Sequence, residues 1–253
     1  MSETAWYLGC SAEDVAARAI LVGDPGRIDL FAAELDEARS VGENRGLRVV
    51  TGSYRGTPLT VCAFGMGAPI AVIVLEELAQ LGVRTVLRVG TVMTLLPEAL
   101  GQLLLARAGI RGEGTSHTYL PADAPATADP ELLDAARAAV EALGERYRVG
   151  VVASLDGFYS QMFAARGDRE EQVAEELARL ARAGAAAVDM ETAALLAVAP
   201  LVGVRAGSLC LATVDASTRQ KLDGPERHEA EERLVRAALA VIVRDPVRLR
   251  QEV

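Results

Sequence analysis

Aromatic side chains are scarce in this sequence, because Phe, Trp and Tyr together make up 4% of its 253 residues. Hydrophobic residues nevertheless make up 51% of the chain, and Ala, Val and Leu supply most of them. A chain of this length and hydrophobicity can bury a sizeable core, so disorder is excluded. We expect closely packed helices and strands whose core is built from small side chains.

Cysteine and basic residues are also few. Three cysteines, Cys10, Cys62 and Cys210, lie far apart without a C-x-x-C pair, which argues against a disulfide framework and a zinc site and suits a reducing cytosol. Cys62 and Cys210 lie in apolar runs and are expected in the core. The formal net charge of -9 argues against nucleic acid as the main partner. A local site for an anion is still compatible with this charge.

Long apolar runs are absent. No stretch approaches the roughly 20 apolar residues that cross a bilayer, and the first ten residues, MSETAWYLGC, lack the basic and apolar regions of a secretory signal. We therefore expect a cytoplasmic protein that neither spans a membrane nor carries a Sec signal.

Short apolar runs alternate with helical patterns, which predicts an α/β fold with a largely parallel or mixed central sheet. Strands are expected at 18–22, 59–64, 85–89, 102–106, 149–153 and 204–212, and helices at 69–81, 130–143, 169–182, 190–199 and 226–243. Pro69 and Pro130 suit a first helical position, and Asp129 suits an N-cap. Residues 48–62 are expected to form a hairpin that turns at Arg55-Gly56. Residues 120–128 are expected to form a loop inside a single domain, 1–253, without repeats or linkers.

Ligands of open α/β sheets collect at the carboxyl ends of strands, and four motifs lie there. The first is GDPGR at 23–27, where Gly23 allows close approach to the backbone and Pro25 stiffens the turn that aims Arg27. A strand-to-helix turn with a solvated arginine explains this motif equally well.

The second motif, LRVGT at 87–91, places Arg88 inside an apolar strand before Gly90 and Thr91. A buried arginine needs a partner, which is either a carboxylate of the protein or a bound anion such as phosphate.

The third motif is GMG at 65–67, which suggests a ligand close to the backbone but is more often only a turn. The fourth is VDMETAA at 188–194, where Asp189 and Glu191 lie at the start of a helix. Helix capping explains these carboxylates, and so does binding of a vicinal diol by Glu191. Motifs of serine hydrolases, Walker ATPases and zinc proteases are absent. The four motifs together suit a phosphate beside a ribose.

Six ordered segments, LVGDPGR (21–27), NRG (44–46), FGMG (64–67), VLRVGT (86–91), FY (158–159) and VDMETAA (188–194), resemble the nucleoside phosphorylase family. The resemblance covers about residues 7 to 243 and is to the hexameric branch, which holds bacterial purine nucleoside and uridine phosphorylases. It implies a three-layer fold with a central mixed, partly barrel-like sheet. It also implies phosphorolysis, in which inorganic phosphate attacks C1′ of a nucleoside and releases the base and ribose 1-phosphate. No metal or cofactor besides the co-substrate phosphate is implied.

The resemblance also implies roles for single residues. Phosphate would be held by Gly23, Arg27, Arg88 and Thr91, with Arg45 reaching in from a neighbouring subunit of a hexamer built as a trimer of dimers. Ribose would be bound by Tyr7, Met66, Met190 and Glu191. The base would be bound by Thr91, Val92, Met93, Phe158, Asp189 and Asp215, and Arg88 and Asp215 would be catalytic.

The leaving base gains electrons and needs a proton or hydrogen bonds, and Asp215 in LATVDAST is the candidate donor. Matching Asp215 to the purine pattern requires a one-residue length difference in the preceding strand.

The sequence departs from the family pattern at three places. Tyr7 stands where the family usually has a histidine for the 5′-hydroxyl, and Val92-Met93 replaces a small residue and a glycine beside the base. In FYSQMFAAR, Gln161 and Arg166 do not match the spacing with which uridine phosphorylases bind uracil, so uridine specificity is not supported.

Two other functions are open. A nucleosidase on the same fold would use water, but it would have no use for the phosphate-site residues. A nucleoside-binding protein without turnover is compatible with the altered base site. Of the two histidines, His228 is expected in solvent, and His117 could approach the site.

Overall fold

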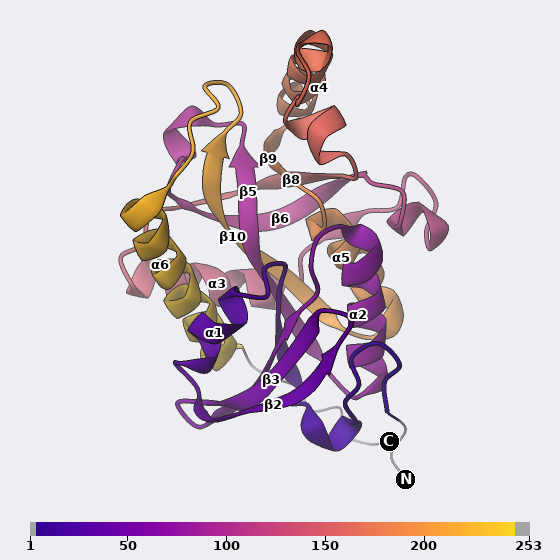
Figure 1. Cartoon of the computed structure of the whole chain (residues 1–253), viewed down its shortest axis with the longest axis vertical. Coiled ribbons are helices and arrows are strands. Elements are labelled where there is room, and N and C mark those ends of the chain that lie inside the picture. Colours follow the sequence, from indigo (N-terminus) through magenta and orange to yellow (C-terminus); the bar gives the residue numbers. More distant parts are fainter. Residues whose placement is uncertain (1–3, 246–253) are drawn as a thin grey trace.

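The strands of the protein form one mixed sheet, seen in a computed structural model that describes residues 4–245 (Figure 1). The strands are β1 (Arg18–Val22), β2 (Asp36–Asn44), β3 (Leu47–Tyr54), β4 (Thr57–Ala63), β5 (Thr85–Thr94), β6 (Leu103–Gly112), β7 (Ala126–Thr127), β8 (Tyr147–Leu155), β9 (Ala185–Asp189) and β10 (Arg205–Asp215). The helices are α1 (Arg27–Ala32), α2 (Ala68–Gln80), α3 (Pro130–Ala142), α4 (Glu170–Arg182), α5 (Thr192–Val198) and α6 (Gly224–Arg244). Phe158–Met162 forms a π-helical turn.

Part of the sheet closes on itself. β5 pairs with β10, β10 with β6, β6 with β8, β8 with β9, and β9 again with β5, so these strands form a small barrel. The sheet continues from β5 as an open extension that consists of β1, β4, β3 and β2 in this order. The predicted α/β fold with a mixed, partly barrel-like sheet is confirmed.

Helices cover the sheet on two sides. α1, α3 and α6 pack on one side, whereas α2 and α5 pack on the other (Figure 1). α4 lies at one end of the barrel and extends away from the body of the molecule. Within residues 4–245, no helix combines the length and hydrophobicity that crossing a membrane requires.

The predicted hairpin is confirmed. β3 and β4 are antiparallel and pair Tyr54 with Thr57, so the turn consists of Arg55 and Gly56. Both turn residues have positive φ, 51° and 75°, as a two-residue turn of type I′ requires. The N-cap prediction also holds, because the Asp129 side chain accepts a hydrogen bond from the backbone N–H of Leu132 at 2.9 Å.

Three elements lack a strong local pattern and were not expected. β2 is a largely exposed edge strand of polar residues that exists because β3 pairs with it. β9 reads AAAVD, which has little strand propensity, but it is buried throughout between β8 and β5. α1 has only six residues. The segment 120–128 is a loop apart from β7, which pairs with β6.

Small side chains bring the layers close together. A Cβ atom on Gly109 of β6 would lie 2.6 Å from the Cα atom of Ala193 in α5, and one on Gly150 of β8 would lie 2.6 Å from the Cβ of Ala186. Both distances are too short for any residue except glycine. The core of Ala, Val and Leu therefore owes its density to close approach of the backbones.

Candidate functional site

The first and third motifs, GDPGR and GMG, lie side by side. β1 and β4 are parallel neighbours, and beyond their ends the backbone N–H of Gly65 donates to the carbonyl of Gly23 at 3.0 Å. A Cβ atom on Gly23 would lie 2.9 Å from the carbonyl oxygen of Gly65, so position 23 needs glycine. GDPGR and FGMG therefore form one shelf of backbone at the carboxyl edge of the sheet.

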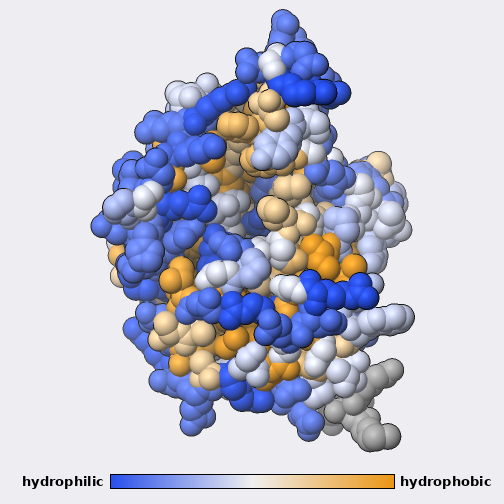
Figure 2. All heavy atoms as spheres, viewed as in Figure 1, coloured by the Kyte–Doolittle hydropathy of each residue, from blue (hydrophilic) through white to orange (hydrophobic). Residues whose placement is uncertain are grey.

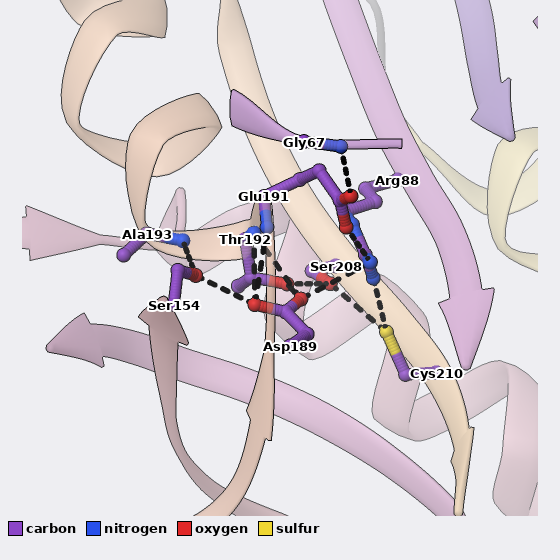
Figure 3. Close-up of polar contacts among 9 residues, drawn as sticks. All are labelled: Gly67, Arg88, Ser154, Asp189, Glu191, Thr192, Ala193, Ser208 and Cys210. Carbon is purple, nitrogen blue, oxygen red and sulfur yellow. Dashed lines mark hydrogen bonds and ion pairs between the residues drawn. The ribbon is translucent and has the colours of Figure 1, made fainter. Parts of the chain in front are cut away.

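Arg88 is buried beside this shelf, with 4% of its surface exposed. Its Nη2 lies 2.6 Å from Oε2 of Glu191 and 3.1 Å from Oδ2 of Asp189 (Figure 3). Its Nη1 donates to Sγ of Cys210. Among the described residues, its Nε has no hydrogen-bond partner. Of the two kinds of partner that a buried arginine could have, the structure shows the carboxylates.

Two local features hold Arg88 in this position and keep it charged. A Cβ atom on Gly90 would lie 2.7 Å from Nη1 of Arg88, so the glycine makes room for the guanidinium to fold back over its own strand. Burial alone would lower the pKa of Arg88, but the acidic groups around it, Asp189 and Glu191 among them, outweigh burial and raise it. The arginine is therefore a permanent cation.

Glu191 joins the shelf to Arg88. Its Oε1 accepts a hydrogen bond from the backbone N–H of Gly67 at 2.7 Å, and its Oε2 faces Arg88 (Figure 3). Gly67 has φ of 100°, a conformation that favours glycine. The carboxylate is 6% exposed and comes directly before α5. Three of the four strand-end motifs thus meet at one carboxylate.

Asp189 is held more firmly than Glu191. Its oxygens accept hydrogen bonds from the Ser154 hydroxyl at 2.6 Å, from the Thr192 hydroxyl, and from the backbone N–H groups of Glu191 and Thr192. These contacts cap the first turn of α5, so capping explains Asp189. They leave its carboxylate directed at Arg88.

Arg27 is the second buried arginine, with 4% of its surface exposed. Its Nη2 lies 3.3 Å from Oε1 of Glu231 in α6. Its Nε is buried and has no hydrogen-bond partner within residues 4–245. Arg27 is the first residue of α1. Because its side chain is buried, it is not the solvated arginine that a simple turn would carry.

Tyr7 and Arg45 pair with each other. Arg45 lies in the turn between β2 and β3 with φ of 52°, and its guanidinium carbon is 5.4 Å from the centre of the Tyr7 ring. The backbone N–H groups of Tyr7 and Leu8 donate to the carboxylate of Glu77 at 2.8 Å each. These contacts fix the loop that carries Tyr7 against α2.

The residues predicted to bind the base lie at the end of the barrel. Val92 and Met93 point to opposite sides of β5 and pack in different clusters. Phe158 is 39% exposed and stacks on Phe163 with ring centres 6.0 Å apart. Thr91 and Met190 are half-buried, whereas Met66 is 82% exposed.

Asp215 ends β10 and caps the loop that follows. Its Oδ1 accepts hydrogen bonds from the backbone and hydroxyl of Ser217, each at 2.7 Å, and from the backbone of Thr218 at 2.9 Å. Burial alone would raise the pKa of Asp215, but these hydrogen bonds outweigh it and lower the pKa below its usual value. In this conformation Asp215 is an ionised acceptor.

Sequence reasoning missed the polar groups around Arg88 and Asp189, namely Ser154, Thr192, Ser208 and Cys210. The Thr192 and Ser208 hydroxyls lie 3.0 Å apart, and the Ser208 hydroxyl lies 3.4 Å from Cys210 Sγ. The available signal was a serine in the apolar run GSLCLA, two residues before a cysteine on the same face of the strand. Cys62 and Cys210 are buried, as expected of core residues.

The histidines contribute no contact to this group of residues. His117 Nε2 lies 3.2 Å from the Arg111 carbonyl of its own loop, and His228 is exposed beside Glu232. In the described part of the chain, no three His, Cys, Asp or Glu side chains are grouped as a metal site would require.

Comparisons with known proteins identify a matching family model, similar sequences and a similar structure. The family model described as "Phosphorylase superfamily" matches residues 17–245. Uridine phosphorylase of Thermococcus kodakarensis is 36% identical over 218 residues, which cover 85% of this chain and 79% of that protein. Guanosine phosphorylase of Halorubrum lacusprofundi is 37% identical over 205 residues, covering 81% and 80%. The crystal structure of uridine phosphorylase from Vibrio fischeri superposes with a TM-score of 0.83 at 28% identity, covering 95% of this chain and 98% of that one.

Proposed function

This chain belongs to the phosphorylase superfamily, and we propose that it is a pentosyltransferase that cleaves a nucleoside with inorganic phosphate. The products are the free base and ribose or deoxyribose 1-phosphate. The observation that supports the proposal is the contact of Arg88 with Glu191 beside the backbone shelf, because a guanidinium suits phosphate and a carboxylate suits sugar hydroxyls. The relatives named above act on uridine or on guanosine, so the proposal covers a nucleoside without fixing its base.

Phosphate binding is assigned to Arg27 and Arg88, each of which has a buried Nε–H without a hydrogen-bond partner among the described residues. Guanidinium groups suit a tetrahedral oxyanion because they donate paired hydrogen bonds. Gly23 would allow the phosphate to approach the backbone closely, and Thr91 would donate a hydrogen bond from its hydroxyl. Arg45 is assigned to the phosphate site of a neighbouring subunit.

Ribose binding is assigned to Glu191, whose carboxylate can accept hydrogen bonds from the 2′- and 3′-hydroxyls. Met190 and Met66 would pack against the sugar, and Tyr7 would approach the 5′ end from a neighbouring subunit. The same carboxylate contacts Arg88, which is assigned to phosphate, so sugar and phosphate binding would be coupled through Glu191.

Base binding is assigned to Phe158, Thr91 and Met93 around the end of β5, with Asp215 near the leaving nitrogen. Val92, which the resemblance assigned to the base as well, points to the opposite side of β5 from Met93 and packs in another cluster. Asp189, which the family resemblance also placed here, is directed at Arg88, and its support of that arginine is its proposed role.

In the reaction, the bond from C1′ to the base nitrogen breaks and a bond from C1′ to a phosphate oxygen forms. Positive charge develops on the ribose and is stabilised by the phosphate that Arg27 and Arg88 hold. The electron pair of the broken bond leaves with the base, which must gain a proton or accept hydrogen bonds. Asp215 can donate a proton only after it loses the loop hydrogen bonds that keep it ionised.

The shared roles of Tyr7 and Arg45 lead us to propose a homo-oligomer, a hexamer built as a trimer of dimers, that acts in the cytoplasm. Phosphate is proposed as the co-substrate and no cofactor is invoked.

The test measures release of free base from inosine, guanosine, adenosine, uridine, thymidine and 5′-methylthioadenosine, each with and without inorganic phosphate. We expect release that depends on phosphate. Arg88→Lys keeps the charge but loses the planar fork, so kcat/KM should fall about 100-fold or more.

The matched control is Arg39→Lys, because Arg39 is an exposed arginine on β2 that pairs only weakly with Asp14. Its activity should equal that of the wild type. Base release that proceeds equally well without phosphate would instead identify a nucleosidase.

A further inference from the structure

A cavity of about 550 Å³ lies between α4, the π-helical turn, the end of β5 and the loop after β10. We call it the α4 cavity, and Met93, Leu95, Phe163, Leu177, Ala178 and Arg219 are among the residues that line it. Figure 2 shows hydrophobic atoms gathered beneath α4 and hydrophilic atoms around them. This volume lies in the range of about 300–1,000 Å³ that is typical of small-molecule sites.

The α4 cavity shares walls with the residues assigned to the base. Met93 belongs to both, and it lies two residues beyond Thr91 on the same face of β5. Phe163 also lines the cavity, and it stacks on Phe158. Ser217 is a further lining residue, and its backbone N–H and its hydroxyl both donate hydrogen bonds to Asp215. A base bound at these residues therefore lies next to the cavity.

Much of the lining is apolar. Leu95, Val173 and Leu177 offer no side-chain hydrogen bonds, so a polar group placed there would lose its water without compensation. On the α4 side the space exists because Ala174, Ala178 and Ala181 recur on one face of the helix at spacings of four and three residues. Larger side chains at these positions would fill the cavity.

The border of the cavity is charged. The Arg219 guanidinium lies 5.1 Å from the centre of the Phe163 ring and 3.7 Å from Glu170 of α4, so it spans from the β10–α6 loop to α4. Arg219 has φ of 59°, a conformation that costs a non-glycine residue energy and that occurs more often at functional sites. Charged groups at the border and apolar groups inside select an occupant that is apolar at one end.

We propose that the α4 cavity is a subsite for an apolar group carried by the base, so that the preferred substrates are nucleosides with a base enlarged by a hydrophobic substituent. The inference rests on the proposed function, because it takes the base to bind at Met93, Phe158 and Asp215. It explains why a methionine stands at position 93: the side chain forms part of an apolar wall that extends past the base.

The experiment compares three pairs of substrates in the presence of phosphate: adenosine with N6-benzyladenosine, guanosine with N2-benzylguanosine, and uridine with 5-benzyluridine. For the base that the enzyme accepts, we expect kcat/KM of the benzyl compound to equal or exceed that of the parent. The variant Ala178→Phe fills the cavity from α4. It should lower kcat/KM for the benzyl compound about tenfold or more, because the added ring takes the apolar space that the benzyl group would occupy, and leave the parent within about twofold.

The matched control is Ala183→Phe, directly after α4, where the added ring points to solvent and both substrates should react as with the wild type. Rejection of every benzyl compound, or an equal effect of Ala178→Phe on both members of a pair, overturns the subsite. Failure of the proposed function gives a different result, since the parent nucleosides themselves would not be cleaved. In that case calorimetric binding of 6-benzylaminopurine and 5-benzyluracil decides: loss of binding in Ala178→Phe supports the subsite, and unchanged or absent binding overturns it.

Discussion

Two helices flank β9 and differ in almost every respect. α4 precedes the strand and buries only Val173, Leu177 and Leu180 among its 13 residues. α5 follows the strand and buries all seven of its residues. A helix with apolar residues on one stripe exposes its other face to solvent, whereas a helix with apolar residues on all sides must be buried on all sides.

The difference matches what each helix carries. Glu191 directly precedes α5, and its position is defined by Gly67 and Arg88. α5 approaches β6 so closely that Gly109 has no room for a side chain. α4 borders a cavity and buries a single stripe of residues against the barrel. Glu191, which needs a fixed geometry, is thus positioned by the buried helix α5. The side of the α4 cavity that can tolerate substitution belongs to the exposed helix α4.

The largest expected effect breaks the packing of α5. Leu196→Ala should lower the free energy of unfolding by about 2–5 kcal/mol, since Leu196 is 1% exposed and its loss leaves a cavity in a dense core. Leu177→Ala on α4 should cost less than half as much, because its side chain already borders open space. Urea titration with an unchanged m-value measures both. Equal costs would show that α4 packs as tightly as α5.

A smaller effect is expected at the start of α5. Glu191→Gln keeps the shape but loses the charge that strengthens hydrogen bonds to sugar hydroxyls, so kcat/KM for ribonucleosides should fall about 10- to 100-fold. The 2′-deoxyribonucleoside should lose less, because it makes one of these bonds fewer. Kinetics on each ribo and deoxy pair provide the measurement. An equal loss on both sugars would argue that Glu191 acts only through Arg88.

The smallest effect concerns the loop that borders the α4 cavity. The pKa of Asp215 is lower in the folded protein than in the unfolded chain, so its carboxylate stabilises the fold above the unfolded pKa of roughly 4 and loses that contribution as the pH falls through the folded value. Asp215→Asn should therefore lower Tm by a few degrees at neutral pH, from a loss of about 1 kcal/mol. The difference should shrink as the pH falls below about 4 and vanish below the folded pKa of Asp215. Thermal melts across this range test the sign, and a gap that widens in acid would contradict it.

Much of the fold follows from local patterns. The strands at 18–22, 59–64 and 149–153 and the helix at 130–143 are read from apolar runs, periodicity and a cap, because local propensity and burial favour the same structure there. β2 and β9 could not be found in this way. β2 is polar, β9 is mostly alanine, and both are strands because neighbouring strands supply their hydrogen bonds.

The site divides in the same manner. The motifs around Gly23, Gly65, Arg88 and Glu191 are visible because glycine and charge are unusual at the ends of apolar strands. The sequence could not show that Asp189 faces Arg88, or that Ser154 holds Asp189, since these contacts join β9 to β5 and to β8.

The sequence by itself determined which chemical groups are available, and it placed them at the carboxyl ends of the strands, because that placement depends only on where each apolar run stops. The tertiary structure alone decided which groups meet. The closed ring of β5, β10, β6, β8 and β9 brings Cys210 and Glu191 to the same guanidinium, and the alanine face of α4 leaves a cavity against β5. Both depend on strand register and packing between residues far apart in the chain, which no local pattern encodes.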